Sequence, residues 1–117
     1  MISSKEKAYI AYEALEEKKG EDIKVLKIDQ VSTLADYFII AGGNNKNQVQ
    51  AMADETEERL GQAGVSPKHI EGYLSGSWIL MDYNDVVIHI FDAENRSLFD
   101  LERIWRDGEV VSKEDLA

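Results

Sequence analysis

The sequence contains no cysteine, a single proline and only two histidines among its 117 residues. Without cysteine the chain can form no disulfide, no zinc–thiolate site and no thiolate nucleophile. The two histidines, His69 and His89, are too few for a histidine-rich metal site. No apolar run approaches the about 20 residues that span a bilayer, and the first residues resemble neither a signal peptide nor a transit peptide. We therefore expect a cytoplasmic protein that makes no contact with a membrane.

Acidic residues outnumber basic residues by 23 to 13, which gives the chain a net charge of −10. This excess repels phosphate backbones, so it disfavours broad nucleic-acid binding and favours a basic protein partner. A solvated acidic surface without any partner explains the same charge. Hydrophobic residues make up 44% of the chain and charged residues 31%, as in ordinary globular proteins, and the length fits one domain.

Apolar residues that recur at helical spacing predict three helices, over residues 4–19, 45–63 and 94–106. Ser4 is the expected N-cap of the first helix, and Asn44 or Asn45 is the expected N-cap of the second. Gly64 ends the second helix. One stripe of that helix should face the core, formed by Val49, Met52, Ala53, Thr56 and Leu60.

Five strands are predicted, over residues 23–29, 36–41, 69–74, 77–83 and 86–92. The segment 36–41 is almost wholly apolar, which is typical of a central strand covered on both faces. The order α-β-β-α-β-β-β-α predicts an α/β protein, a single domain with a mixed five-stranded sheet and helices. We expect this domain to cover residues 1–108 and residues 109–117 to form a frayed tail.

Only Asn84 and Asp85 separate the last two strands, which predicts a β-hairpin with a two-residue turn. Such a turn fixes the register, so alternate residues of each strand share a face. One face is almost wholly aliphatic and should pack beneath the helices. Its pairs are Tyr83 with Val86, Met81 with Ile88 and Ile79 with Ile90. We call the other face the mixed face, and its pairs are Trp78 with Phe91, Leu80 with His89 and Asp82 with Val87.

The mixed face combines aromatic and aliphatic side chains with a carboxylate and an imidazole. A core has little use for Asp82 and His89, whereas a solvent-facing surface has little use for Trp78, Leu80 and Phe91. This composition is typical of a protein-binding surface. A further helix or a second subunit that covers the face explains it as well, and every one of these interpretations makes it an interface. For His89, an ordinary sheet histidine is favoured over a metal ligand or a base.

Two features resemble parts of an enzyme site. Gly42 and Gly43 precede a helix start, where a phosphate could dock, but the neighbouring residues lack the Walker and dinucleotide-binding patterns. A glycine pair that only forms a turn is therefore favoured. A nucleotidyl-transfer site needs two carboxylates on one face of one strand, whereas Asp82 and Asp85 straddle the turn and point to different sides.

Residues 36–60 and 71–105 resemble the ribosomal silencing factor family, also called the Iojap-like family. The most specific string is W-I-L-x-D-Y-x-D-V-x-x-H-x-F, which is followed by L-E-R-x-W. The resemblance implies a nucleotidyltransferase-like fold without catalytic carboxylates, and a protein that is not an enzyme and uses no cofactor or metal. It also implies binding to protein fourteen of the large ribosomal subunit, a steric block of joining with the small subunit under nutrient limitation, and a homodimer in isolation.

The partner-binding signature of the family falls on Trp78, Leu80, Asp82, Tyr83, Asp85, Val87 and His89. Tyr83 and Asp85 are expected at the tip of the mixed face, and the other five residues lie on it. Tyr73, on the neighbouring strand, is a further candidate for the same surface.

The chain departs from the family pattern at two places. The family usually has G-N-S and then arginine after the second strand, where residues 43–46 read G-N-N-K, and it usually has glycine where Asn84 stands. Asn84 keeps the turn possible, whereas the first departure weakens any role carried over to that helix start. The alternative function is a small nucleotide-binding or nucleotidyl-transfer enzyme on the same fold.

Overall fold

The structure is a computed structural model that describes residues 2–29, 35–92 and 109–116. Its mixed sheet has six strands in the order β3-β4-β5-β2-β1-β6. The strands are β1 (Glu21–Lys27), β2 (Tyr37–Gly43), β3 (His69–Glu71), β4 (Trp78–Asp82), β5 (Val86–Asp92) and β6 (Glu109–Val111). The helices are α1 (Ser4–Glu17), α2 (Lys46–Gln62) and α5 (Lys113–Leu116). The predicted α/β domain is confirmed, with one strand more than expected.

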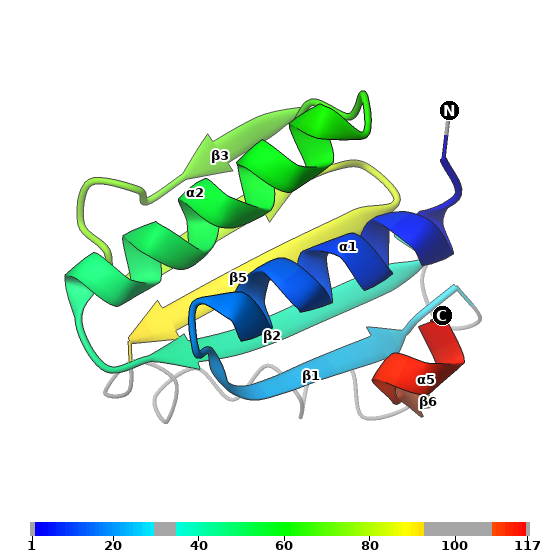
Figure 1. The fold of residues 1–117 in the computed structure, drawn as a ribbon, viewed down its shortest axis with the longest axis horizontal. Helices are drawn as coiled ribbons and strands as arrows, with labels where there is room; N and C mark the ends of the chain where they lie inside the picture. The colour runs from blue at the N-terminus through cyan, green and yellow to red at the C-terminus, as the bar shows by residue number, and fades with distance from the viewer. Residues whose placement is uncertain (1, 30–34, 93–108, 117) are drawn as a thin grey trace.

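The two long helices, α1 and α2, lie on one face of the sheet, over β2 and β5 (Figure 1). Ser3, and not the expected Ser4, caps α1, because Ser3 has the extended backbone of an N-cap and its Oγ accepts the Glu6 backbone N–H at 3.1 Å. At the start of α2, the backbone N–H of Gln48 donates to Asn45 Oδ1 at 2.8 Å. The prediction of an asparagine cap is therefore confirmed for Asn45.

The central strand is β2, and all seven of its residues are buried. It pairs in parallel with β5 and antiparallel with β1. Its side chains alternate between two cores: Ile39 packs on the helix side, whereas Phe38 and Ile40 pack on the opposite side. The prediction of a central strand covered on both faces is confirmed.

The larger core lies between the helices and the sheet. The predicted stripe of α2 is confirmed, because Val49, Met52, Ala53, Thr56 and Leu60 are all buried. The hairpin contributes four aliphatic side chains with no exposed surface, Ile79, Met81, Ile88 and Ile90. Burying each such side chain contributes about 1.5–3 kcal/mol, so this face holds the two helices against the sheet.

The C-terminal segment differs from the prediction. Residues 109–116 form β6 and α5, where the sequence predicted a frayed tail. Val111 pairs with Val25 of β1 and packs against the larger core, while Leu116 is 3% exposed. Lys113 Nζ donates to Glu16 Oε1 of α1 at 2.8 Å. These contacts order the segment and add the sixth strand. The predicted strand 69–74 shortens to β3, and the helix predicted over residues 94–106 lies outside the described residues.

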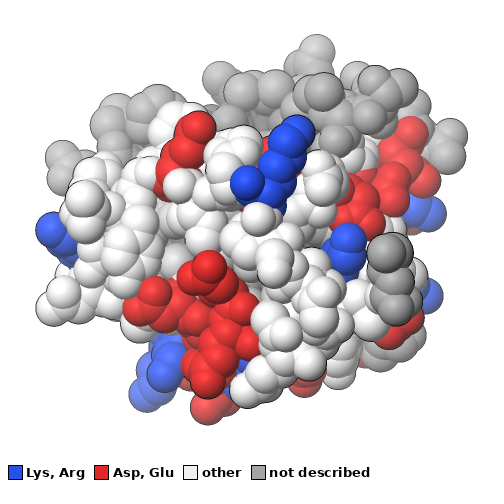
Figure 2. All heavy atoms as spheres, turned by 90° about the horizontal axis from the view of Figure 1, so that it is seen from above, with Lys and Arg blue, Asp and Glu red and all other residues white. Residues whose placement is uncertain are grey.

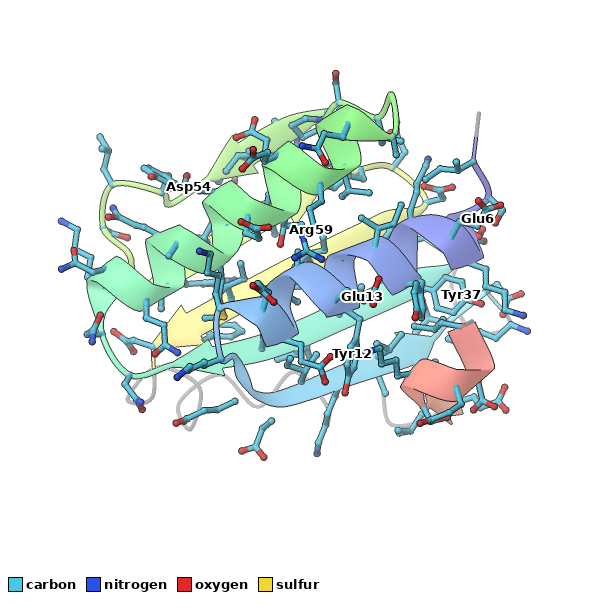
Figure 3. All side chains as sticks on the ribbon, in the orientation of Figure 1. Glu6, Tyr12, Glu13, Tyr37, Asp54 and Arg59 are labelled. Atoms are coloured by element: carbon cyan, nitrogen blue, oxygen red, sulfur yellow. The ribbon has the colours of Figure 1, made fainter. Side chains whose placement is uncertain are left out.

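Charged side chains join the two helices above the core. Arg59 of α2 points toward α1 (Figure 3), and its Nη2 lies 3.9 Å from Glu17 Oε2. The Arg59 Nε donates to Glu55 Oε2, one turn earlier in α2, at 2.7 Å. This hydrogen bond raises the pKa of Arg59. The guanidinium therefore stays charged and links the helices at their exposed edge.

Substituting Gly72 tests how tightly the turn before β4 is packed, and substituting Gly61 in α2 serves as the contrast. Gly72 has φ +80°, and a Cβ there would overlap the carbonyl oxygen of Trp78. We expect Gly72→Ala to lower the free energy of unfolding by about 1–3 kcal/mol from the backbone conformation alone. Around Gly61 in α2 there is open space for a Cβ. Gly61→Ala should therefore raise the free energy of unfolding by about 0.5–1 kcal/mol. Urea unfolding of both variants measures this contrast, and equal effects would contradict it.

Candidate functional site

The β4–β5 hairpin has the register that the sequence predicts. Trp78 pairs with Phe91, Leu80 with His89 and Asp82 with Val87. Asn84 adopts φ 71° in the turn, which asparagine tolerates better than most residues. The Tyr83 backbone N–H donates to the Val86 carbonyl at 2.9 Å and closes the turn. The hairpin therefore presents its aliphatic residues to the helices and the mixed face to the other side of the sheet.

Four aromatic rings form the centre of the mixed face. Trp78 stacks on Phe91, with ring centroids 5.3 Å apart, and His89 stacks on Phe38 of β2 at 4.3 Å. The Trp78 indole Nε1–H donates to His89 Nδ1 at 3.0 Å. Trp78 is half-buried, whereas Phe91 and His89 are buried. The cluster thus holds the one tryptophan of the hairpin in a fixed orientation while part of it stays accessible.

His89 is neutral at neutral pH. Burial lowers its pKa to about 4, since an apolar surrounding disfavours the charged imidazolium. Because Nδ1 accepts the indole hydrogen, the proton of the neutral ring lies on Nε2. No described residue accepts a hydrogen bond from this buried Nε2. The prediction of an ordinary sheet histidine is confirmed in its burial and pairing. The sequence did not indicate that Nε2–H would lack an acceptor among the described residues.

A cavity of about 390 Å³ lies at the turn end of the mixed face. Its lining is mostly apolar and consists of Ile28, Ala35, Phe38, Lys68, Leu80, Asp82, Asn84, Val87 and His89. A second hollow of about 230 Å³ is lined by Glu71, Gly72, Trp78 and Leu80. Leu80 therefore separates two hollows, each bordered by one ring of the Trp78–His89 pair.

The two aspartates of the hairpin point in different directions, as predicted. Asp82 Oδ1 accepts the Asn84 backbone N–H at 2.8 Å, and its Oδ2 lies 3.8 Å from His69 Nδ1 of β3. Asp85 Oδ1 instead accepts from Lys7 Nζ of α1 at 2.9 Å. Asp82 belongs to the mixed face, whereas Asp85 ties the turn to the helix layer. The pair cannot hold two metal ions on one face.

Two tyrosines expected near the mixed face lie elsewhere. Tyr83 is 2% exposed and packs in the larger core, because its register position faces the helices. Burial raises the pKa of its phenol. Tyr73 also packs on the helix side, and its hydroxyl donates to Asp54 Oδ2 of α2 at 3.0 Å, which raises the pKa of Tyr73. The register prediction that Tyr83 shares the aliphatic face with Val86 is therefore confirmed, and neither Tyr83 nor Tyr73 contributes its side chain to the mixed face.

Sequence reasoning missed part of the cavity lining. Ile28 and Phe38 come from the β1 end and from β2, and Lys68 precedes β3. The hairpin pattern alone could not place these segments beside it. Phe38 carried one signal, since it alternates with Ile39 in a strand predicted to be covered on both faces.

The start of α2 is filled by the protein's own side chains. Gln48 Oε1 accepts the Asn44 backbone N–H at 2.6 Å, and Gln48 Nε2 donates to the carbonyls of Lys18 and Lys19 at 3.1 and 3.0 Å. A Cβ on Gly43 would lie 2.9 Å from side-chain atoms of Met52 and Val49, so helix packing requires this glycine. These contacts favour the structural interpretation of the glycine pair, although both glycines continue β2 and do not form a turn.

Acidic side chains gather on the exposed surface of α2. Asp54, Glu57 and Glu58 are exposed there, and Figure 2 shows acidic groups clustered over this helix beside a wider uncharged surface. Among residues 2–29, 35–92 and 109–116, no three histidine or carboxylate side chains are grouped as metal ligands would be. None of the described helices has the length and apolar content needed to cross a membrane.

This fold and this site define a small α/β protein whose sheet carries an aromatic and apolar cluster on the face away from its two long helices. A model of the family described as "Ribosomal silencing factor during starvation" matches residues 1–117. The chain belongs to the ribosomal silencing factor family. This family consists of ribosome-associated regulators of translation. The resemblance found in the sequence is confirmed.

Relatives span nearly the same length. A ribosomal silencing factor of Bacillus subtilis is 40% identical over 99 residues, which cover 85% of this chain and 84% of that protein. The factor of Halalkalibacterium halodurans is 36% identical over 113 residues, which cover 97% of each chain. A mouse protein named mitochondrial assembly of ribosomal large subunit protein 1 is 27% identical over 78% of this chain and 41% of its own length.

Solved structures share the fold. A crystal structure of a Chromobacterium violaceum protein matches with a TM-score of 0.87 and 36% identity, over 95% of this chain and 92% of that one. A Bacillus halodurans structure matches with a TM-score of 0.79 and 35% identity, over 88% and 93%.

The burial of His89 predicts a pH dependence of stability. Its pKa is about 4 in the folded chain and 6.5 for an exposed histidine, so the unfolded chain binds more protons between these values. The free energy of unfolding should therefore fall by about 3 kcal/mol as the pH drops from about 6.5 to about 4. Gln in place of His89 keeps an acceptor for Trp78 but does not titrate. Urea unfolding should show a shallower pH dependence for His89→Gln than for the unchanged chain, and parallel curves would contradict the assignment.

Proposed function

We propose that this protein represses translation by binding protein fourteen of the large ribosomal subunit through the mixed face. The bound protein then occupies a surface that the small subunit requires, so the two subunits cannot join. This action is purely steric and needs neither catalysis nor a cofactor. We further propose that it operates in the cytoplasm when nutrients are short.

The mixed face carries this proposal. Trp78, Leu80 and Val87 are half-buried, so each leaves apolar surface that a partner can cover. Aromatic side chains at the centre of an apolar surface with polar groups at its border are the usual anchors of protein interfaces. The name of the mouse relative connects that protein with the large ribosomal subunit. For this chain, binding through the opposite face is disfavoured, because α1 and α2 already cover it.

Charge favours the same partner. Proteins of the large subunit are typically basic, and this chain carries a net charge of −10. Complementary charge accelerates the encounter between two proteins more than it stabilises the final complex. Asp82, beside the cavity, supplies a negative group at the interface itself. We also propose that the isolated protein forms a homodimer.

Removing the central tryptophan tests the site. We expect Trp78→Ala to weaken binding to large subunits by about 30- to 1,000-fold, because truncating an interface tryptophan commonly costs about 2–4 kcal/mol. The measurement is co-sedimentation of the purified protein with separated subunits in a sucrose gradient. Tyr12→Ala is the matched control, since Tyr12 is a half-buried aromatic residue of α1 on the far side of the sheet.

The unchanged protein should sediment with the large subunit alone. Its failure to sediment with either subunit would refute the proposed function. Equal loss of binding in Trp78→Ala and Tyr12→Ala would refute the site. Sedimentation equilibrium of Trp78→Ala separates a docking face from a dimer face, because a monomeric variant that still binds large subunits would assign the mixed face to the homodimer.

Salt dependence tests the electrostatic part. Raising the ionic strength from about 0.1 M to about 1 M shortens the screening length from about 10 Å to about 3 Å. The association rate with large subunits should fall at least about tenfold, while the dissociation rate changes little. Asp82→Asn keeps a side-chain acceptor for Asn84 and should slow association more than Asp54→Asn, the matched change on α2. Surface plasmon resonance measures both rates, and salt-independent association would contradict this account.

A further inference from the structure

The cavity at the turn end of the mixed face combines an apolar wall with one buried polar group that has no hydrogen-bond partner among the described residues. Its volume of about 390 Å³ lies in the range of sites that receive ligand groups. Phe38, Leu80 and Val87 supply apolar wall, and Leu80 and Val87 are only half-buried. Such a cavity can receive an apolar side chain from outside and remove it from water.

The buried polar group is the Nε2–H of His89, whose imidazole lines this cavity. The residue is 4% exposed, and no described residue accepts a hydrogen bond from Nε2. Buried donors nearly always have a partner in folded proteins, so an orphan donor beside a cavity indicates a missing acceptor. The Trp78 indole fixes which nitrogen carries the hydrogen, because it donates to Nδ1 at 3.0 Å. Through its remaining nitrogen, the imidazole can therefore offer a partner only a donor.

We propose that the bound partner inserts an apolar side chain into this cavity and that a backbone carbonyl of the same segment accepts a hydrogen bond from His89 Nε2. This inference rests on the proposed function and names the chemistry by which the mixed face recognises its partner. Leu80 and Val87 border the imidazole and have to shift their side chains to admit the carbonyl. His89 then has two roles, since it orients Trp78 through Nδ1 and contacts the partner through Nε2.

The arrangement of the two hollows favours a protein segment as the occupant. Leu80 lies between the cavity and the hollow beside Trp78. Alternate residues of a strand lie about 7 Å apart on one face, so a segment that crosses Leu80 can place side chains on either side of it. Lys68 and Asp82 line the cavity beside its apolar wall and can pair with polar groups of that segment. A segment with apolar side chains matches the apolar wall, and basic groups beside them match Asp82 and the net charge of −10.

Filling the cavity tests the proposal. Val87→Phe enlarges a lining side chain, and we expect at least tenfold weaker binding to isolated large-subunit protein fourteen in titration calorimetry. Ile10→Phe is the matched control, because Ile10 lines a hollow of similar size, about 350 Å³, beside Leu116. Ile10→Phe should bind within about twofold of the unchanged protein. Thermal unfolding of both variants checks that each is folded, and Val87→Leu replaces Val87→Phe if the latter unfolds.

A second measurement uses the unchanged protein. In a nitrogen-15 spectrum, the His89 Nε2–H signal should move downfield and exchange more slowly with water when protein fourteen is added. Equal binding of the Val87 and Ile10 variants would overturn the cavity proposal, as would an unmoved Nε2–H signal at saturation. In both cases the proposed function stands, because the unchanged protein binds. Absence of binding by the unchanged protein overturns the proposed function and this inference together.

Discussion

The whole fold depends on the burial of β2 on both faces, because a separate hydrophobic core packs against each side of this strand. Ile39 contributes to the core under α1 and α2, whereas Phe38 and Ile40 contribute to the core on the other side. The parallel pairing with β5 then fixes where the hairpin lies relative to both cores. Phe38 pairs with Val87 in this register, which brings a core ring beside the mixed face and its cavity. The site is therefore an extension of the second core toward the surface.

The hairpin turn decides which side chains of β4 and β5 form the mixed face. Because side chains alternate along a strand, a slip of one residue would exchange the aliphatic face for the mixed face. Asn84 accepts the left-handed backbone of the turn, and the Asp82 carboxylate holds its N–H. The same Asp82 lines the cavity, so one side chain both fixes the register and contributes charge to the proposed interface. The turn therefore forms here without a glycine.

Local patterns in the sequence were sufficient for the two long helices, for β1, β2, β4 and β5, and for the hairpin pairs. The α2 stripe and the pairing of Leu80 with His89 follow from periodicity and from a turn of two residues. Long-range contacts escaped prediction. Residues 109–116 carry weak helix and strand signals and become ordered only against β1 and α1. Tyr73 carries no local sign that its hydroxyl reaches Asp54. The cavity likewise forms between segments that no single pattern connects.

The contact between Lys7 and Asp85 joins residues that are 78 positions apart, and Lys113 reaches back 97 positions to Glu16. Contacts of such separation slow folding, because a long loop must close before they form. During synthesis α1 is made first, yet its partners at the turn and in α5 appear only much later. The sheet also lacks β5, the neighbour of β2, until residue 92 has been added. The mixed face therefore cannot form in a nascent chain until β5 has been synthesised, because half of its paired residues belong to that strand.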